Sequence, residues 1–194
     1  MSKTRTARAS GHLGPLGQCL FGGVSGAVAT WPMTLLMREL HHHLPPEEQY
    51  PLPPRVITMN VANRVGVASK LDARERFTLT VGAHYAYGAA AGALYAAWFR
   101  HGSRHPVLRG MMFGLGVWAV SYFSLLPAAG LFPPADRQPL RRNALMIAAH
   151  LLWGAVLGFV EDGGRRLASQ RVRVLKWPGR TRPAEKSTTA GDRW

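Results

Sequence analysis

Two histidines recur in the same sequence context. Residues 84–92 read HYAYGAAAG and residues 150–158 read HLLWGAVLG, so both segments fit the pattern H-x-x-aromatic-G-A-x-x-G. Imidazole ionises near neutral pH and can carry a proton, ligate a metal or haem iron, or form hydrogen bonds to neighbouring groups. His84 and His150 are therefore the first candidates for chemistry in this chain.

Three interpretations of this histidine pair are open. Each ring can tie helices together by a hydrogen bond, the two can line a path for protons or a solute, or they can form a bis-histidine haem or metal site. No third metal ligand is evident, because Cys19 belongs to the far end of its apolar stretch and no carboxylate lies within one. We therefore predict no cofactor and no metal, with haem as the alternative.

Motifs of the common enzyme classes are absent. The chain has no P-loop, no G-x-S-x-G, no H-E-x-x-H and no pair of cysteines,. Ser121 and Tyr122 are interpreted as packing or hydrogen-bonding residues. We predict no catalytic residues and a protein that is not an enzyme.

Long uncharged stretches show which elements carry the histidines. About 20 apolar residues cross a bilayer as a helix, and a single strand cannot satisfy its backbone in lipid. We predict an all-α membrane protein with four transmembrane helices at about 16–38, 77–99, 108–131 and 143–161. The predicted domains are a basic cytoplasmic N-terminus at 1–12, a membrane domain at 13–162, and a basic, partly disordered cytoplasmic tail at 163–194.

A cleaved signal peptide is the alternative for the first stretch. Lys3, Arg5 and Arg8 give a positive start, and residues 27–29 read AVA, as before a cleavage site,. The glycines at 22, 23 and 26 weaken the apolar core, and the uncharged run continues to Met37. We therefore interpret the stretch as a span.

The chain is strongly basic, with 24 Lys and Arg against 10 Asp and Glu and a net charge of +14. Because these charges flank the apolar stretches, and nucleic-acid motifs are missing, we predict contact with anionic lipid headgroups at the C-terminal tail and no nucleic-acid partner. Fifteen basic residues lie in the two tails and the second predicted loop, and nine lie in the other two loops. Positive charge marks the cytoplasmic side, so we expect a multi-pass protein of the bacterial inner membrane with both termini inside.

The first predicted loop, residues 39–76, carries its own helical pattern. Ile57, Val61, Val65 and Ala68 recur every three or four residues. This spacing predicts a short helix on the membrane surface, with residues 60, 64 and 70 on its wet face. The His41–His43 run before it is interpreted as solvated, although it could bind metal.

Each predicted span contains a pair of glycines four residues apart. Glycines at this spacing share one face, where helix backbones can approach closely. The pairs predict a tight four-helix bundle, and they are Gly22/Gly26, Gly88/Gly92, Gly110/Gly114 and Gly154/Gly158. Pro32 and Pro127 are predicted to kink the first and third spans.

The two histidine segments suggest a duplicated helical hairpin. Each histidine follows the start of its span by seven residues, about 10 Å of helix. Each also shares a face with its two glycines. We expect both rings to point into the bundle, and to face each other if the duplication is structural. At the end of the last span, Glu161 and Asp162 are predicted to pair with Arg165 and Arg166.

Several segments together resemble the YagU-like family of bacterial inner-membrane proteins, a domain family without an established molecular activity. The similarity covers about residues 20–160. It is carried by G-x-x-x-G-x-x-A-T-x-P-M-T at 22–34, the histidine–glycine segments from 84 and 150, and W-x-x-S-Y at 118–122 with Pro127. The resemblance implies a bacterial plasma-membrane protein and carries over no catalytic residue.

Three functional hypotheses follow. The first is a non-enzymatic scaffold or accessory membrane subunit, with a membrane-protein partner or a second copy of itself. The second is a small transporter or channel with His84 and His150 lining its interior. The third is a haem-binding electron carrier, which needs a gap between the second and fourth helices that is wide enough for a porphyrin.

Overall fold

The structure, a computed structural model, describes residues 14–99 and 102–175. Every regular element in these ranges is a helix, which confirms the all-α prediction. The α-helices are α1 (Pro15–His42), α2 (Pro53–Arg64), α3 (Ala73–Trp98), α4 (Pro106–Val120), α5 (Leu126–Ala128) and α6 (Leu140–Leu175). The short turns are η1 (Pro46–Glu48), η2 (Ala68–Lys70) and η4 (Ala135–Arg137), with a π-helical turn, η3 (Ser121–Leu125), between α4 and α5.

Three helices in the described part of the chain are long and apolar enough to cross a membrane. They are α1, the continuous run of α4, η3 and α5 (Pro106–Ala128), and α6 as far as Leu167. The prediction of four such helices was wrong, because α3, the predicted second span, does not qualify. α3 has the length, at 26 residues, but residues 82–97 are mostly alanine, glycine and tyrosine, with His84 among them. These residues favour lipid less than leucine or valine does.

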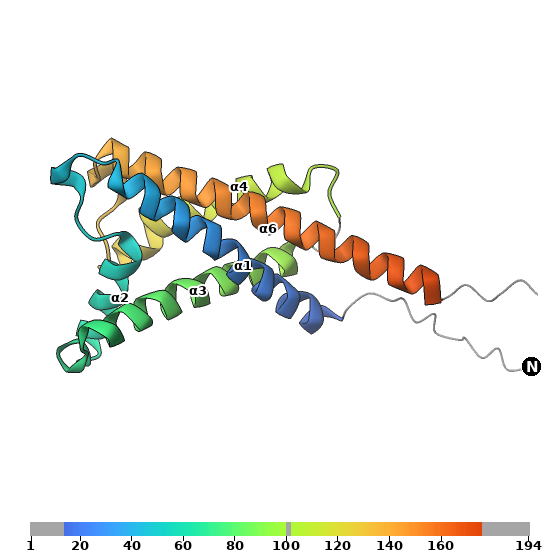
Figure 1. The fold of residues 1–194 in the computed structure, drawn as a ribbon, viewed down its shortest axis with the longest axis horizontal. Coiled ribbons are helices and arrows are strands. Elements are labelled where there is room, and N and C mark those ends of the chain that lie inside the picture. Colours follow the sequence, from blue (N-terminus) through green and yellow to red (C-terminus); the bar gives the residue numbers. More distant parts are fainter. Residues whose placement is uncertain (1–13, 100–101, 176–194) are drawn as a thin grey trace, which may run out of the picture.

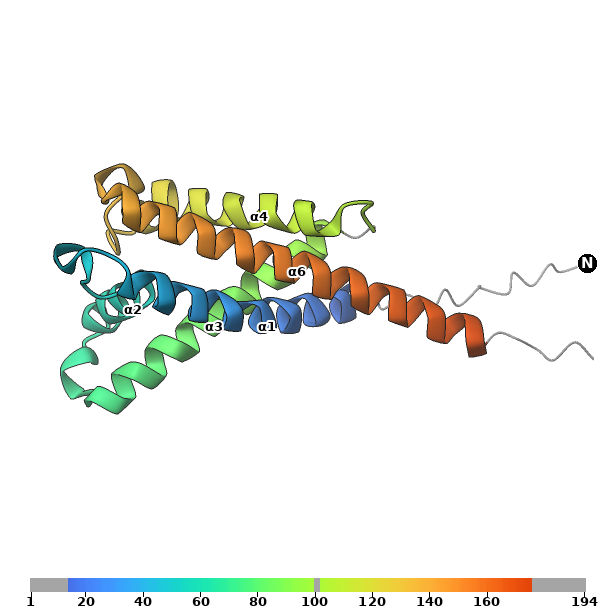
Figure 2. The same ribbon diagram turned by 45° about the horizontal axis from the view of Figure 1, so that its top comes forward.

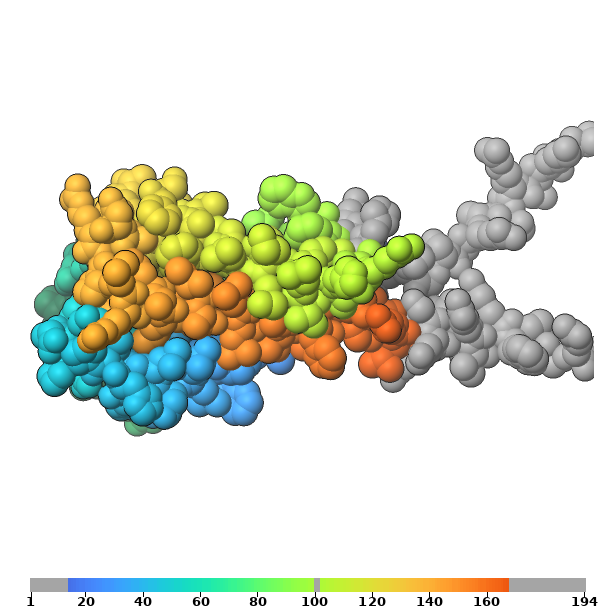
Figure 3. Space-filling view, turned by 90° about the horizontal axis from the view of Figure 1, so that it is seen from above, coloured from blue at the N-terminus to red at the C-terminus, as the bar shows by residue number. Residues whose placement is uncertain are grey.

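The long helices form two hairpins, α1 with α3 and α4 with α6 (Figures 1 and 2). α1 crosses and packs on α3, α4 packs along α6, and α1 joins the hairpins by packing on α6. α3 makes no comparable backbone contact with α4. α1 begins and α6 ends at the same end of the molecule, the terminal end, and α2 lies at the opposite end, the α2 end (Figure 1). Seen from above, α4 and α6 lie side by side along the molecule (Figure 3).

Glycines bring the backbones together inside each hairpin. A Cβ atom on Gly26 would overlap the carbonyl of Gly88, and one on Gly110 would overlap the carbonyl of Gly154. The remaining predicted glycines, Gly22, Gly92, Gly114 and Gly158, meet backbone atoms of the facing helix in the same way. The helices therefore meet backbone to backbone at these glycines, and this close approach sets the geometry of both hairpins,.

The starts of the long helices follow local sequence rules. Proline occupies the first position of α1, α2 and α4, where its missing N–H costs no helical hydrogen bond,. α3 starts at a capping box, in which the Asp72 carboxylate accepts from the Glu75 N–H and the Glu75 carboxylate accepts from the Asp72 N–H, both at 2.8 Å,. The box fixes where α3 leaves the first loop.

Proline has different effects in α1 and in the α4–α5 run. Pro32 lies inside α1, which continues as one helix to His42. Pro127 lies in α5, directly after the π-helical turn of residues 121–125. Because proline has no N–H to donate, a widened turn before it is a local way to rearrange the backbone hydrogen bonds.

α6 runs well past the predicted end of the last span at 161, through Gly163 and Gly164 to Leu175. Two ion pairs bridge these glycines along the helix, Glu161–Arg165 at 2.7 Å and Asp162–Arg166 at 2.6 Å. Pairs at this spacing stabilise a helix and offset part of the cost of glycine. The part of the predicted tail up to 175 is therefore helical. The N-terminal segment 1–12 and the tail beyond 175 lie outside the described residues.

The first loop contains the predicted helix, and two of its polar residues make contacts that the spacing does not predict. Ile57 is half-buried against the core, whereas Val61 and Val65 are exposed. Asn60 is half-buried and Arg64 is exposed, and they donate hydrogen bonds to the carbonyls of Leu131 (2.8 Å) and Gly130 (3.0 Å). These bonds tie α2 to the loop between α5 and α6, a contact that helical spacing alone does not reveal.

Arg142 holds the rest of this loop in place. The residue is 4% exposed, and its guanidinium donates to the carbonyls of Glu48, Tyr50 and Pro51 at 2.6, 3.0 and 3.1 Å. The same group lies 3.7 Å from the centre of the Tyr50 ring. One arginine at the start of α6 thus anchors the loop that leads into α2.

Candidate functional site

A pocket of about 400 Å³ lies between the two hairpins at the α2 end. We call it the interhairpin pocket. Residues of all six α-helices and of η3 line it, and representative residues are Met33 of α1, Ile57 of α2, His84 of α3, Ser121 of η3 and His150 of α6. Toward the α2 end, α3 diverges from α4 and α6 (Figure 2), and residues of all three helices line the pocket.

Both candidate histidines line this pocket. They come from α3 and α6, which belong to different hairpins. From the sequence, we expect both rings to point into the bundle, and to face each other if the duplication is structural. The crossing of α1 with α3 and the packing of α1 on α6 are what bring the two rings to one cavity.

The two rings differ in their hydrogen bonds. Nδ1 of His150 lies 2.8 Å from the backbone carbonyl of Met146, and the side chain is 5% exposed. Nε2 of His84 is buried and has no hydrogen-bond partner among the described residues. A buried polar atom without a partner costs free energy unless a further group binds it. A partner for Nε2 of His84 must therefore come from outside the described residues.

A tyrosine–serine pair adds a second polar feature. The hydroxyls of Tyr87 and Ser121 are 2.7 Å apart, and Ser121 also donates to the carbonyl of Val117 at 2.6 Å. Since Ser121 has one proton and uses it on that carbonyl, Tyr87 is the donor to Ser121. Ser121 lies at the start of the π-helical turn, a feature common at functional sites,. The sequence marks Ser121 as a hydrogen-bonding residue but does not identify its partner.

The walls and rim of the pocket are apolar. Of the residues that line it, none is Asp, Glu, Lys or Arg. Val61, Val65 and Tyr87 are 43%, 66% and 46% exposed, so the pocket opens to the outside past these side chains. An apolar cavity with a few convergent polar groups is the usual form of a small-molecule site.

Trp153 closes one wall of the pocket and fixes the two hairpins to each other. Its indole Nε1 donates to the carbonyl of Gly26 in α1 at 3.1 Å, and its side chain is 2% exposed. In the repeated pattern Trp153 corresponds to Tyr87, so the two aromatic residues of the pattern make different bonds. Tyr87 reaches across to η3, whereas Trp153 reaches α1.

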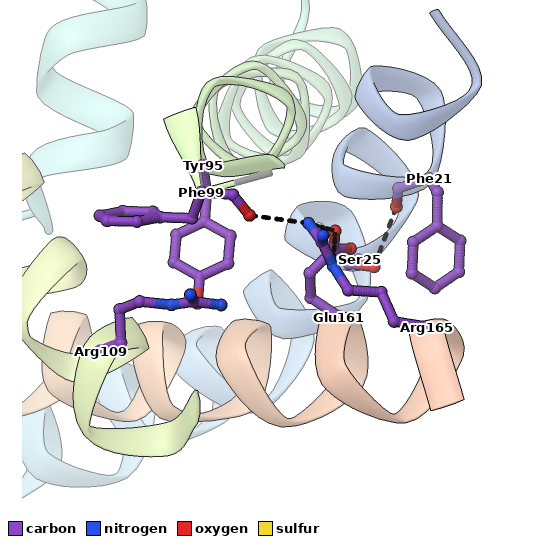
Figure 4. Close-up of polar contacts among 7 residues, drawn as sticks. All are labelled: Phe21, Ser25, Tyr95, Phe99, Arg109, Glu161 and Arg165. Carbon is purple, nitrogen blue, oxygen red and sulfur yellow. Dashed lines mark hydrogen bonds and ion pairs between the residues drawn. The ribbon is translucent and has the colours of Figure 1, made fainter. Parts of the chain in front are cut away.

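A second polar cluster lies at the terminal end, away from the pocket (Figure 4). Glu161 is 2% exposed and accepts from Arg165 at 2.7 Å, and Arg165 also donates to the carbonyl of Phe99 at 2.9 Å. Arg109 donates to the Tyr95 hydroxyl at 3.1 Å. Arg165 therefore binds the end of α3 to α6, and Arg109 binds α3 to α4.

The described residues contain no group of three or more His, Cys, Asp and Glu side chains arranged to hold a metal ion. In the His41–His43 run, Nε2 of His41 contacts the carbonyl of Tyr50 at 3.0 Å, and Nε2 of His43 pairs with Glu39 at 3.2 Å. These contacts give the run local structural partners.

Comparison with known proteins identifies one family. The family model described as "Protein of unknown function (DUF1440)" matches residues 44–159, more than half of the chain. No curated protein and no solved structure matches. The matched range includes α2, α3 and both pocket histidines, whereas α1 and the Glu161–Arg165 pair lie outside it. The chain belongs to the DUF1440 family of proteins of unknown function.

Proposed function

We propose that this chain is a non-enzymatic membrane protein that holds a membrane-borne amphiphile in the interhairpin pocket. By amphiphile we mean a molecule with an apolar tail and a small polar head. The observation that carries the proposal is the pocket itself, in which buried polar groups lie at the inner wall and exposed apolar side chains form the rim. A tail would leave past Val61 and Val65, and the head would meet His84 and His150.

The membrane setting supports this class of ligand. Three helices around the pocket are apolar enough to cross a bilayer, so a molecule dissolved in the bilayer reaches the rim without entering water,. We propose the bacterial inner membrane, as the resemblance to the YagU-like family implies. We also propose that the terminal end faces the cytoplasm, because most basic residues flank that end,.

Two further roles remain as proposals. A transporter or channel is favoured by the same observation, because both histidines line one pocket and imidazole can pass a proton between solutes,. A scaffold or accessory subunit would use the exposed apolar stripe of α1, which includes Leu16, Leu20 and Val24 at 73%, 63% and 63% exposure. In a bilayer that stripe faces lipid, a partner helix or a second copy.

Haem is the alternative that the histidine pair favours most specifically. Nδ1 of His150 bonds to a carbonyl, which leaves Nε2 as the ligating atom, as is common for histidine ligands,. No cationic side chain lines the pocket to pair with the haem carboxylates. An absorption spectrum of the protein purified from its host in mild detergent decides this point. A Soret band that is lost in His84→Ala or His150→Ala would replace the amphiphile proposal with a haem protein.

The amphiphile proposal is tested by photolabelling in liposomes. The probe is a C16 alcohol with a diazirine in its alkyl chain, and labelled peptides are mapped by mass spectrometry. We expect label to concentrate on peptides of α2, α3 and α6 that line the pocket. Ala83→Trp fills the pocket, and Ala86→Trp is the matched control, because both alanines are exposed on α3 but only Ala83 lines the pocket. Label spread evenly over the apolar helix faces, and unaffected by Ala83→Trp, would overturn the proposal.

A further inference from the structure

The hydrogen bond of His150 fixes which of its ring nitrogens carries a proton. The Met146 carbonyl can only accept, so Nδ1 of His150 must be the donor across the 2.8 Å contact,. A neutral imidazole has one N–H, which leaves Nε2 as an acceptor with a free lone pair. A second proton would place a positive charge among uncharged walls, and burial of an unpaired charge is costly,.

The Nε2 acceptor of His150 has no hydrogen-bond partner among the described residues, and the residue lines the pocket. A ligand that satisfies it must bring an O–H or N–H donor. His84 lines the same pocket, its Nε2 is buried and unpartnered, and the ring makes no other hydrogen bond in the described chain. In the tautomer with a proton on Nε2, His84 is a hydrogen-bond donor.

A hydroxyl group meets both requirements at once, because it donates one hydrogen bond and accepts another. An ether or ester oxygen can accept from His84 but leaves His150 unsatisfied. A carboxylate or a phosphate would lack a cation to offset its charge, since no charged side chain lines the pocket,. An ammonium group could donate to His150 but has no carboxylate to pair with.

We propose that the ligand of the interhairpin pocket is a neutral long-chain alcohol, whose hydroxyl donates to Nε2 of His150 and accepts from Nε2 of His84. This inference rests on the proposed function and names the head group that the pocket selects. The volume of about 400 Å³ lies within the range of small-molecule pockets, so it holds the head and the first part of the chain,. The remainder of the chain lies past the apolar rim in the bilayer.

The test compares three diazirine probes of equal chain length in liposomes: the C16 alcohol, its O-methyl ether and the matching carboxylic acid at pH 8. We expect the alcohol to label the pocket peptides about tenfold more than the ether, the ratio expected for one buried hydrogen bond. The acid should label them no better than the ether. Equal labelling by alcohol and ether, or preference for the acid, would overturn the inference and leave the amphiphile proposal standing. If no probe favours the pocket peptides, the proposed function itself fails.

Two variants assign the preference to the histidines. His150→Asn keeps an N–H that can bond to the Met146 carbonyl but has no atom at the position of Nε2. We expect it to bring the alcohol-to-ether ratio to about one, while ether labelling stays at the wild-type level. His84→Phe keeps the ring shape at a half-buried position, so it preserves the fold if His150→Asn does not. It removes the donor that both probes use, so we expect weaker labelling by both the alcohol and the ether and an unchanged ratio. A ratio that stays near ten in folded His150→Asn, or wild-type labelling by both probes in His84→Phe, would overturn the assignment.

Discussion

Replacing one glycine of the α4–α6 crossing with alanine tests the packing that defines the second hairpin. In Gly110→Ala, the new Cβ would overlap the carbonyl oxygen of Gly154, and it would lie 2.9 Å from the carbonyl carbon of Gly154 and 3.0 Å from Cα of Gly158. Carbon atoms pack at about 3.5–4.0 Å, so α4 and α6 must move apart by at least about 0.5 Å. All three of these atoms belong to the backbone, which cannot move aside as the end of a flexible side chain can.

The matched control is Gly116→Ala on the same helix. Gly116 is exposed, and a Cβ there meets no atom within 4 Å. Alanine raises intrinsic helix stability by up to about 1 kcal/mol at either position, and this gain cancels when the two variants are compared. The difference between them then measures the overlap alone. Overpacking lowers the free energy of unfolding by about 1–3 kcal/mol. Because the backbone is rigid on both sides of this contact, we expect a loss near the upper end for Gly110→Ala, about 3 kcal/mol.

The measurement is the free energy of unfolding in mixed micelles, obtained by titration with dodecyl sulfate and followed by far-ultraviolet circular dichroism. We expect Gly110→Ala to unfold at lower dodecyl sulfate fraction than wild type, and Gly116→Ala at the same or a higher fraction. If the two variants unfold together, the backbones of α4 and α6 are not in contact at this crossing, and the packing argument is refuted.

Three further substitutions test single contacts. Arg142→Met removes three hydrogen bonds from a charged donor, so we expect the free energy of unfolding to fall by about 3 kcal/mol,. We also expect faster amide exchange in residues 44–52, measured by hydrogen-exchange mass spectrometry, and unchanged exchange there would contradict the anchoring role. Glu161→Gln and Arg165→Gln, combined in a double-mutant cycle of unfolding free energies, should show a coupling of about 2 kcal/mol, and a coupling of zero would mean that the pair adds no stability,. Trp153→Phe loses the hydrogen bond to the Gly26 carbonyl, so we expect its free energy of unfolding to be about 1 kcal/mol lower than that of wild type,. A free energy of unfolding equal to that of wild type would exclude the bond.

Much of the fold could be predicted from local sequence because its causes are local. The all-helical class follows from long apolar stretches that cannot cross a bilayer in another form. The helix in the first loop follows from the three- and four-residue spacing of Ile57, Val61 and Val65. The ion pairs after Glu161 follow from spacing along one helix. Each of these features depends on residues close together in the chain.

One prediction failed because of composition, and one contact could not be predicted because its partner is distant in the chain. The second stretch lacks charge but is rich in alanine, glycine and tyrosine, so α3 is less apolar than the three candidate spans. Asn60 and Arg64 lie on the polar side of α2, but the loop between α5 and α6 lies beside them and provides carbonyl acceptors. Helical spacing does not show whether such a loop is near.

The sequence by itself determined which helix faces carry glycine and which carry large side chains. Only the tertiary structure decided what the faces with large side chains enclose. Gly88 and Gly92 of α3 pack against α1, so α3 has no glycine pair left for a close contact with α4. Large side chains hold these helices apart instead, with the rings of Tyr95 and Phe113 5.1 Å apart near the terminal end. The space left at the α2 end is the pocket that His84 and His150 both line. Its existence depends on how two hairpins dock, which no local pattern encodes.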